Sequence, residues 1–195
     1  MSLPILKYGN PVLRQKGARI ESITAEIQEL IADMRETMYA AKGVGLAAQQ
    51  VGKALQLAIV DVSGVTDRPS TLELHGKPAD VEALMPVVLI NPQIKPVGDP
   101  VRGPEGCLSF PEIYDEISRP GFVEVTALNE KGKRIQFRCG GLLARAIQHE
   151  VDHLNGILFI DRMGREKKLE LKPELDALQA ATKEALKRKK SSHKQ

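Results

Sequence analysis

The sequence is poor in cysteine, lacks tryptophan and contains no long apolar run. Two cysteines in 195 residues do not make a disulfide framework, so each is expected to be a metal ligand, a nucleophile or core filler. The apolar run MPVVLI is far shorter than the roughly 20 residues that a membrane-spanning helix needs. The first residues, MSLPILKYGNP, lack the charged region and the long apolar stretch of a secretory signal. We therefore expect a cytoplasmic protein that contacts no membrane.

The length and composition predict one folded domain with a sizeable core. Hydrophobic residues make up 42% of the chain and charged residues 27%, which is ordinary for a globular protein. The net charge of +3 is unevenly placed, because residues 183–195, KEALKRKKSSHKQ, carry six basic side chains and one acidic one. Such a tail is either a solvated, frayed end or a contact site for a polyanion such as RNA.

The spacing of apolar residues predicts an amphipathic helix from Thr24 up to Gly43. The runs LQLAIVDV and VVLINP are typical of buried strands, and FVEVTAL and RIQFRC alternate on either side of NEKGK, which predicts a hairpin. A second helix is expected over GGLLARAIQHEVDHLNG, closed by a left-handed cap at Asn155 and Gly156. A last helix, at about 173–187, leads into the basic tail.

This order of elements favours an α+β domain over a parallel α/β domain. We expect antiparallel β-sheets packed around a central helix that carries an H-E-x-x-H sequence, with an N-terminal amphipathic helix and a C-terminal helix. The polar segment 63–86 is expected to be a surface excursion between two strands. The chain divides into residues 1–172, which hold the motifs described below, and residues 173–195, the C-terminal helix and basic tail.

The stretch AIQHEVDHLNG places His149 and His153 four residues apart and Glu150 between them. Residues i and i+4 of a helix lie over one another, so both imidazoles can bind one metal ion while Glu150 reaches its water. The alternative is a pair of surface or core histidines without a metal. The metal site is favoured because polar side chains on an otherwise apolar helix need partners.

A catalytic site of this kind needs a third protein ligand. Long-motif metalloproteases have a histidine six residues after the second one, but that position is Phe159 here. Glu166 and Glu170 lie in a charged stretch that is expected to face solvent. Cys107, in the turn-forming stretch PEGCLSFPE, is the better candidate, and thiolate with imidazole suits Zn²⁺ or Fe²⁺. Cys139 continues the alternation of a strand and is expected in the core.

A third motif is GVGLAAQQ, residues 43–50. Its glycines let the backbone approach a ligand closely, and the amide of Gln50 can donate to a developing oxyanion. Alone this is weak evidence, because a Gly-x-Gly stretch is usually a turn and a single glutamine usually lies at the surface.

In this order, GVGLAAQQ, EGCLS and QHEVDHLNG resemble the three signature motifs of the peptide deformylases, and the form EGCLSFP resembles the bacterial type most closely. The resemblance extends from PILKYGNPVLR to GILFIDRM. These enzymes remove the formyl group from the initiator methionine of new bacterial and organellar chains. The resemblance implies that residues 1–172 form a catalytic domain, a metal-dependent hydrolase that acts on N-formylmethionyl nascent peptides and releases formate.

The resemblance also implies a role for each chemical group. Cys107, His149 and His153 would bind one divalent metal ion, mainly Fe²⁺ in the family, with Zn²⁺, Ni²⁺ or Co²⁺ tolerated. Glu150 would take a proton from the attacking water and deliver it to the departing amine.

The groups that stabilise the oxyanion would be the side-chain amide of Gln50 and the backbone N–H of Leu108. Val44 and Gly45 on one side, and Gly106 on the other, resemble the backbone edges between which the family lays its peptide as an extra strand.

The pocket for the methionine side chain is expected to include Leu108, Ala146, the apolar part of His149 and the neighbourhood of Val44. Arg145 departs from the family, in which many bacterial members carry an apolar residue at that place. We expect Arg145 either to point to solvent along the pocket rim or to change which second substrate residue is preferred.

Two further expectations concern support and docking. An ion pair between Glu105 and Arg119 would brace the EGCLS strand. Some bacterial deformylases dock beside the ribosomal exit tunnel through their C-terminal helix, and the basic end of LDALQAATKEALKRKK suits contact with ribosomal RNA. DNA is not expected as a partner.

Two other classes of protein stay open. A protease with the same helix would cleave internal peptide bonds and would need a ligand other than Cys107. A structural zinc site in a basic RNA-binding protein would need a fourth protein ligand, and His75 and His193 are poor candidates for it.

Overall fold

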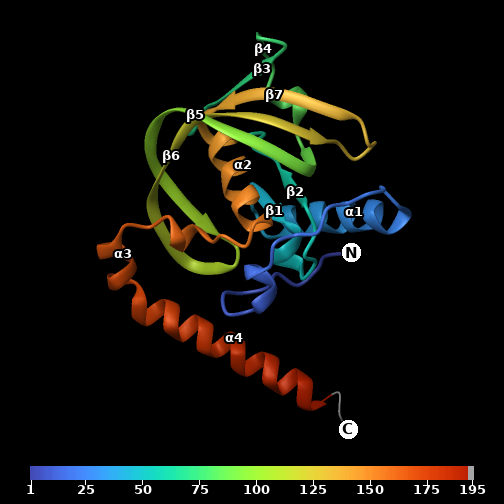
Figure 1. The fold of residues 1–195 in the computed structure, drawn as a ribbon. Helices are drawn as coiled ribbons and strands as arrows, with labels where there is room; N and C mark the ends of the chain where they lie inside the picture. The colour runs from blue at the N-terminus through green and yellow to red at the C-terminus, as the bar shows by residue number, and fades with distance from the viewer. Residues whose placement is uncertain (193–195) are drawn as a thin grey trace.

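The computed structural model describes residues 1–192 and shows antiparallel strands curled around one central helix (Figure 1). The seven strands follow the order β1-β2-β5-β6-β7-β3-β4 across a single sheet. Their bounds are β1 Gly45–Ala47, β2 Leu57–Val60, β3 Ser70–Leu74, β4 Lys77–Ala79, β5 Val87–Cys107, β6 Phe110–Leu128 and β7 Arg134–Gly140. The central helix is α2, Gly141–Leu154. This mixture of helix and antiparallel sheet confirms the predicted α+β class, although the described strands form one sheet rather than several.

The long strands β5 and β6 bend because their pairing is interrupted repeatedly. The register of β5 against β6 shifts at three places along β5: between Ile90 and Gln93, between Val97 and Pro100, and between Gly106 and Cys107. Proline and glycine interrupt a strand ladder, and β5 contains both repeatedly in its run NPQIKPVGDPVRGPEGC. The two strands curve around one side of α2, and their tip returns beneath it (Figure 1). The bend therefore brings Cys107, the last residue of β5, back toward the helix.

Helix α1, Ala25–Ala40, confirms the predicted amphipathic helix. The side chain of Thr24 accepts a hydrogen bond from the backbone N–H of Ile27 at 3.4 Å, which satisfies one of the free donors at the helix start. Its buried residues Ile31, Met34 and Met38 pack with side chains of β1 and β2. The GVGLAAQQ motif thus follows a helix that is anchored in the core.

Strands β6 and β7 form the predicted hairpin. In its turn, the backbone N–H of Asn129 donates to the carbonyl of Lys133 at 2.9 Å, and its side-chain oxygen accepts from the N–H of Lys131 at 3.0 Å. Phe137 and Cys139 face the core cluster around α2. The prediction that Cys139 is a core residue is confirmed.

The prediction for residues 63–86 is wrong in part, because the segment extends the sheet. Strands β3 and β4 form a hairpin that turns at His75 and Gly76, whose φ angles are 52° and 74°, as a two-residue type I′ turn requires. β3 pairs with β7 through Leu72 and Cys139, and Leu72 is buried. The two strands are short and largely exposed. They therefore show too few alternating apolar residues to be predicted from the sequence.

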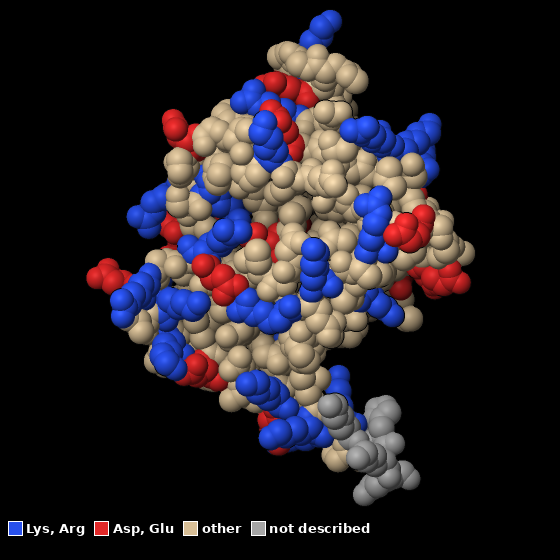
Figure 2. Space-filling model, viewed as in Figure 1, with Lys and Arg blue, Asp and Glu red and all other residues tan. Residues whose placement is uncertain are grey.

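The chain continues after α2 into two helices, α3 (Arg165–Glu170) and α4 (Lys172–Ser192). Leu175 and Leu178 at the start of α4 pack in a cluster with Leu13, whereas the rest of α4 extends away from the body (Figures 1 and 2). Residues 193–195 of the predicted tail, including His193, lie outside the described residues. Short 3₁₀ helices occur at η1 Pro11–Arg14, η2 Ala48–Val51, η3 Glu82–Leu84 and η4 Phe159–Asp161. No described helix is long and apolar enough to cross a membrane.

Candidate functional site

The tip of the β5–β6 hairpin and helix α2 bring Cys107, His149 and His153 together. One ligand atom from each of the three side chains lies within 4.8 Å of the others, and Cys107 Sγ is 3.3 Å from His153 Nε2. The two imidazoles come from successive turns of α2, and their ring centroids are 5.1 Å apart. The group that the sequence indicated is therefore assembled from two separate elements.

This group fits a divalent metal ion. Bonds of roughly 2.0–2.3 Å to a tetrahedral ion place neighbouring ligand atoms about 3.5 Å apart, which matches the 3.3 Å between sulfur and nitrogen. Among the described residues, no fourth histidine, cysteine or carboxylate joins the group. A site with three protein ligands and an open position is typical of catalytic rather than structural metal sites, and thiolate with imidazole favours Zn²⁺ or Fe²⁺.

The orientation of His149 is fixed by Glu105. Nδ1 of His149 is 3.1 Å from Oε2 of Glu105, which leaves Nε2 for a metal ion, as in many metal sites. Burial would raise the pKa of Glu105, but hydrogen bonds from His149 and Arg119 outweigh it and hold this pKa at about 2. Glu105 thus stays ionised and acts as a permanent acceptor for the imidazole.

Arg119 is the buried centre of a larger ion-pair network. Its Nε and Nη2 donate to the two carboxylate oxygens of Glu105, which confirms the predicted ion pair. Its Nη1 donates to Asp152 Oδ2 at 2.8 Å, and Asp152 also accepts from Arg162. Arg119 therefore ties the strand that carries Cys107 to the helix that carries both histidines.

Replacing Arg119 with Ala is expected to destabilise the fold by about 3–5 kcal/mol, because Glu105 and Asp152 lose a buried partner. Metal retention is expected to fall as well, since Glu105 then holds His149 less firmly. Urea unfolding and metal content after dialysis measure the two effects. The matched control is Arg102→Ala, because Arg102 and Glu116 form an ion pair with 71% and 63% exposed side chains. The control should change stability by less than about 1 kcal/mol, and equal results for both variants would contradict the prediction.

The two histidines have opposite pKa shifts. Burial lowers the pKa of His149, but hydrogen bonds with Cys107 and Glu105 outweigh burial and raise this pKa well above its usual range. Burial and the neighbouring His149 lower the pKa of His153. A metal ion binds the neutral form of an imidazole, so an ion and a proton compete for His149.

Glu150 lies beside the three ligands and is buried, with 4% of its surface exposed. Burial raises the pKa of its carboxyl group to about 7, and Oε2 has no hydrogen-bond partner among the described residues. A Cβ atom at Gly45 would lie 2.3 Å from Oε1 of Glu150. Only glycine therefore leaves room for this carboxylate at the start of β1.

The side-chain amide of Gln50 lies close to Cys107. Its Oε1 accepts a hydrogen bond from the backbone N–H of Ala47 at 2.9 Å, which fixes the orientation of the amide. Its Nε2 lies 3.3 Å from Ser109 Oγ and 3.6 Å from Cys107 Sγ. The residue that was weak evidence in the sequence is thus buried next to the predicted metal ligand.

Leu108 lies in the turn between β5 and β6 and faces Gly43, the first residue of the GVG stretch. A Cβ atom at Gly43 would lie 2.8 Å from Leu108 Cδ1. The carbonyl of Leu108 accepts a hydrogen bond from Lys7 Nζ at 2.6 Å. Sequence reasoning missed Lys7, because a lone lysine near the start of a chain carries no motif.

The other predicted substrate residues are Val44, Ala146 and Gly106. Val44 and Ala146 pack in the same core cluster, and Gly106 lies directly before Cys107. A Cβ atom at Gly106 would lie 2.5 Å from the ring of Tyr114, so a side chain here would require this exposed ring to move.

Arg145 does not point to solvent, and that alternative is wrong. Its side chain is only 13% exposed, and its guanidinium donates to Glu105 at 2.9 Å and to the carbonyls of Ile117 and Val101 at 2.8 and 2.7 Å. A buried carboxylate and two backbone carbonyls attract the guanidinium more strongly than solvent at the pocket rim does. An effect of Arg145 on substrate preference stays a prediction.

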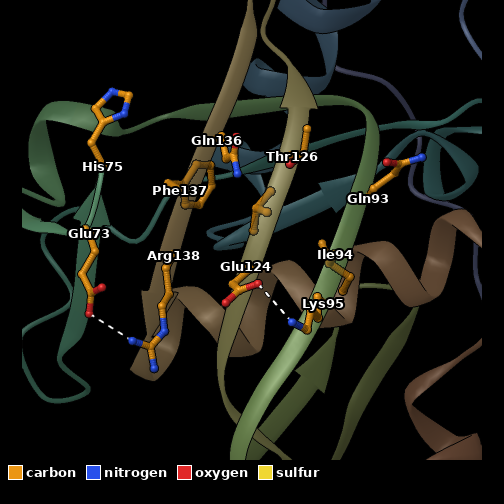
Figure 3. A pocket seen from close by; sticks show the side chains of 12 residues that line it. Glu73, His75, Gln93, Ile94, Lys95, Glu124, Thr126, Gln136, Phe137 and Arg138 are labelled. Atoms are coloured by element: carbon orange, nitrogen blue, oxygen red, sulfur yellow. Dashed lines mark hydrogen bonds and ion pairs between the residues drawn. The ribbon is translucent and has the colours of Figure 1, made fainter.

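A separate groove of about 530 Å³ lies on the outer face of the sheet (Figure 3). Arg138 pairs with Glu73 at 3.4 Å and Lys95 with Glu124 at 3.7 Å across its floor. Phe137, next to Arg138 in β7, points to the opposite face and packs in the cluster around α2. The groove and the candidate metal group therefore lie on opposite sides of the sheet.

Comparisons with known proteins point to one family. The sequence model of the family described as polypeptide deformylase matches residues 2–169. A peptide deformylase of Opitutus terrae is 42% identical over 189 residues, which cover 96% of this chain and 98% of the relative. One of Methylacidiphilum infernorum is 46% identical over 178 residues, with 91% and 93% covered. The crystal structure of a peptide deformylase from Synechococcus elongatus in complex with actinonin is 41% identical and has a TM-score of 0.75, with 90% of this chain and 85% of that chain covered.

Proposed function

The chain belongs to the peptide deformylase family of hydrolases, and we propose that it removes the N-formyl group from the initiator N-formylmethionine of nascent polypeptides. The observation that carries this proposal is the group of Cys107, His149 and His153, with the buried carboxylate of Glu150 beside it. Hydrolysis adds water across the formyl C–N bond and yields formate and a free α-amino group. Because the substrate is a nascent chain, the proposed place of action is the cytoplasm.

The proposed cofactor is one divalent metal ion, Fe²⁺ in the cell, with Zn²⁺, Ni²⁺ or Co²⁺ as alternatives in the purified protein. Cys107, His149 and His153 would hold it through one sulfur and two nitrogens. When bound, the ion supplies Lewis acidity toward the formyl oxygen and the attacking water. The ion pair of Glu105 and Arg119 keeps His149 in the orientation that this binding needs.

Glu150 is the proposed general base and then general acid. Its pKa of about 7 suits a group that must gain and lose a proton near neutral pH. Glu150 takes a proton from water as the water oxygen bonds to the formyl carbon. It then delivers that proton to the nitrogen as the C–N bond breaks, so that the carboxylate is regenerated.

Two N–H donors are proposed to stabilise the negative charge that develops on the formyl oxygen. The Nε2 of Gln50 is held in place by the hydrogen bond between its Oε1 and the N–H of Ala47. The backbone N–H of Leu108 follows directly after the ligand Cys107. Donors that are already oriented lower the barrier because they need no rearrangement in the transition state.

The substrate is proposed to bind as an added strand at the free edge of the sheet. β1 is the edge strand, and Val44 and Gly45 lie at its start. Gly106 on β5 is proposed to flank the peptide on its other side. Backbone groups at such an edge can pair with an extended peptide of any sequence. The methionine side chain would then enter the region lined by Leu108 and Ala146.

The test is release of formate from formyl-Met-Ala-Ser by protein that is purified anaerobically with its metal retained. An N-acetylated peptide is the chemical control, and an internal peptide without a formyl group tests for protease activity. We expect fast formate release and no cleavage of either control. Metal-loaded protein that releases no formate would refute the proposal, and cleavage of the internal peptide would favour a protease.

We also propose that residues 1–172 form the catalytic domain and that residues 173–195 contact ribosomal RNA. The end of α4 is separated from the body of the molecule and carries basic side chains (Figure 2), while its start is anchored by Leu175. Electrostatic contact with RNA phosphates requires exposed basic residues and weakens steeply with salt.

Removal of residues 183–195 is expected to abolish a salt-sensitive association with ribosomes, because the removed segment holds six basic side chains. Co-sedimentation with ribosomes at low and high salt measures the association, and the melting temperature checks folding. The control replaces the exposed Lys77 and Lys131 with Glu, which lowers the net charge at other places. Equal co-sedimentation of the truncated and the intact protein would refute the contact.

A further inference from the structure

Arg145 connects helix α2 to the end of the β5–β6 hairpin. Its Nη1 donates to Glu105 Oε1 at 2.9 Å and to the carbonyl of Ile117 at 2.8 Å, and its Nη2 donates to the carbonyl of Val101 at 2.7 Å. One guanidinium thus binds a side chain on β5 and the backbones of both strands. Its planar fork of donors suits several fixed acceptors at once, as a lysine ammonium does not.

The hairpin is shaped to receive this guanidinium. Gly103 lies between Val101 and Glu105 on the same face of β5 and pairs with Ile117 across the ladder. A Cβ atom at Gly103 would lie 3.0 Å from Nη2 of Arg145 and 3.2 Å from its Cζ and Nε. Any side chain at position 103 would therefore crowd the guanidinium, which would have to shift by a few tenths of an ångström.

The position of Arg145 links the two halves of the candidate metal site. Arg145 precedes His149 by four residues, so both lie on the same face of α2. Glu105, which accepts from Arg145, also accepts from His149 and lies two residues before Cys107. The residue therefore acts between the strand that supplies the sulfur ligand and the helix that supplies both nitrogens.

We propose that Arg145 is a positioning residue that fixes the distance between the hairpin tip and α2, and that shares Glu105 with the ligand His149. The inference rests on the proposed function, because it requires a bound metal ion. Without Arg145, the tip that carries Cys107 is held less firmly, and Glu105 keeps one charged donor fewer. Both changes weaken the hold of the three ligands on the ion.

The experiment compares Arg145→Met, Arg145→Lys and Gly103→Ala with the intact protein, each loaded anaerobically with Co²⁺. A chelator in excess measures the rate of Co²⁺ release, and the absorption band of the thiolate–Co²⁺ bond reports the contact with Cys107. We expect Arg145→Met to release Co²⁺ about 10- to 100-fold faster and to shift or weaken this band. Arg145→Lys should recover part of the loss, and Gly103→Ala should change both readings in the same direction while keeping every charge.

The matched control is Arg138→Met, because Arg138 lies on the outer face of the sheet and pairs with Glu73. If Arg145→Met acted only by lowering the stability of the fold, its melting temperature would fall as that of Arg138→Met does, and the thiolate–Co²⁺ band would not move. That result would also contradict the inference. Unchanged Co²⁺ release and an unchanged band in Arg145→Met would overturn the inference. Intact protein that shows the thiolate band but releases no formate would refute the proposed function instead, and the role of Arg145 would still be measurable on Co²⁺ release.

Discussion

Replacing Glu150 with Gln is expected to lower kcat for formate release by about 10³-fold, because glutamine keeps the shape of the side chain but cannot accept a proton. Only 4% of the surface of Glu150 is exposed and the residue follows the candidate ligand His149, so bulk solvent cannot replace it as the base. KM and metal content should change little, since Glu150 is not among the three ligands. Steady-state kinetics on formyl-Met-Ala-Ser and metal analysis of the same sample measure these quantities.

The control for this prediction is Glu166→Gln. Glu166 lies on α3 outside the group of candidate ligands, although the sequence made it conceivable as a distant ligand. Its replacement should leave kcat and metal content as they are. Glu150→Gln protein that retained more than about a tenth of the activity would show that another group moves the proton.

Replacing Gly45 with Ala is expected to lower kcat/KM by about 10²-fold, since misplacement of a catalytic group by roughly 1 Å costs on that order. The new Cβ would lie 2.3 Å from Oε1 and 2.8 Å from Cδ of Glu150, so the carboxylate has to move. The same methyl group would also lie at the edge where the substrate strand is proposed to pair. Separate values of kcat and KM distinguish the two effects, because a displaced base lowers kcat and a blocked edge raises KM.

Gly164→Ala is the matched control, because a Cβ atom at Gly164 has no heavy atom within 4 Å and its φ of −61° suits any residue. This variant should keep full activity. If Gly45→Ala stayed within about threefold of the intact enzyme, the close approach of β1 to Glu150 would have no role in positioning the base.

The sequence predicts the candidate metal ligands better than it predicts the strands and contacts that position them. The spacing of His149 and His153 depends only on the helix repeat, so one face of α2 could be predicted without knowledge of the fold. Cys107 was found by elimination among possible third ligands. Its distance from the histidines depends on the bend of β5 and β6, which arises from several bulges acting together and cannot be read from any single residue.

Arg145 shows where a further signal was available. It lies four residues before His149, on the same helical face as the ligands. This spacing predicts that Arg145 lies near the residue that hydrogen-bonds to His149. The family resemblance predicts a place at the substrate pocket instead. The acceptors of its guanidinium include two backbone carbonyls, which no sequence pattern marks, so the contact itself could be seen only in the fold.

The β3–β4 hairpin could not be predicted for a different reason. His75 and Gly76 adopt positive φ angles, but histidine before glycine is not a strong turn signal. Leu72 is buried only because β3 pairs with β7. The strand exists through a long-range contact rather than through local preference.

Cys107 and His149 are far apart along the chain, so a metal ion bound to both would affect the stability of the protein and its rate of degradation. An ion bound by both would join points about 40 residues apart, and it would stabilise the folded chain because its ligands come together only in the fold. Unlike a disulfide, this cross-link is removed by any chelator that competes for the ion. Newly made protein that finds no metal would open more often and be degraded sooner. The amount of enzyme in a cell would then follow the metal supply, even where synthesis of the chain is constant.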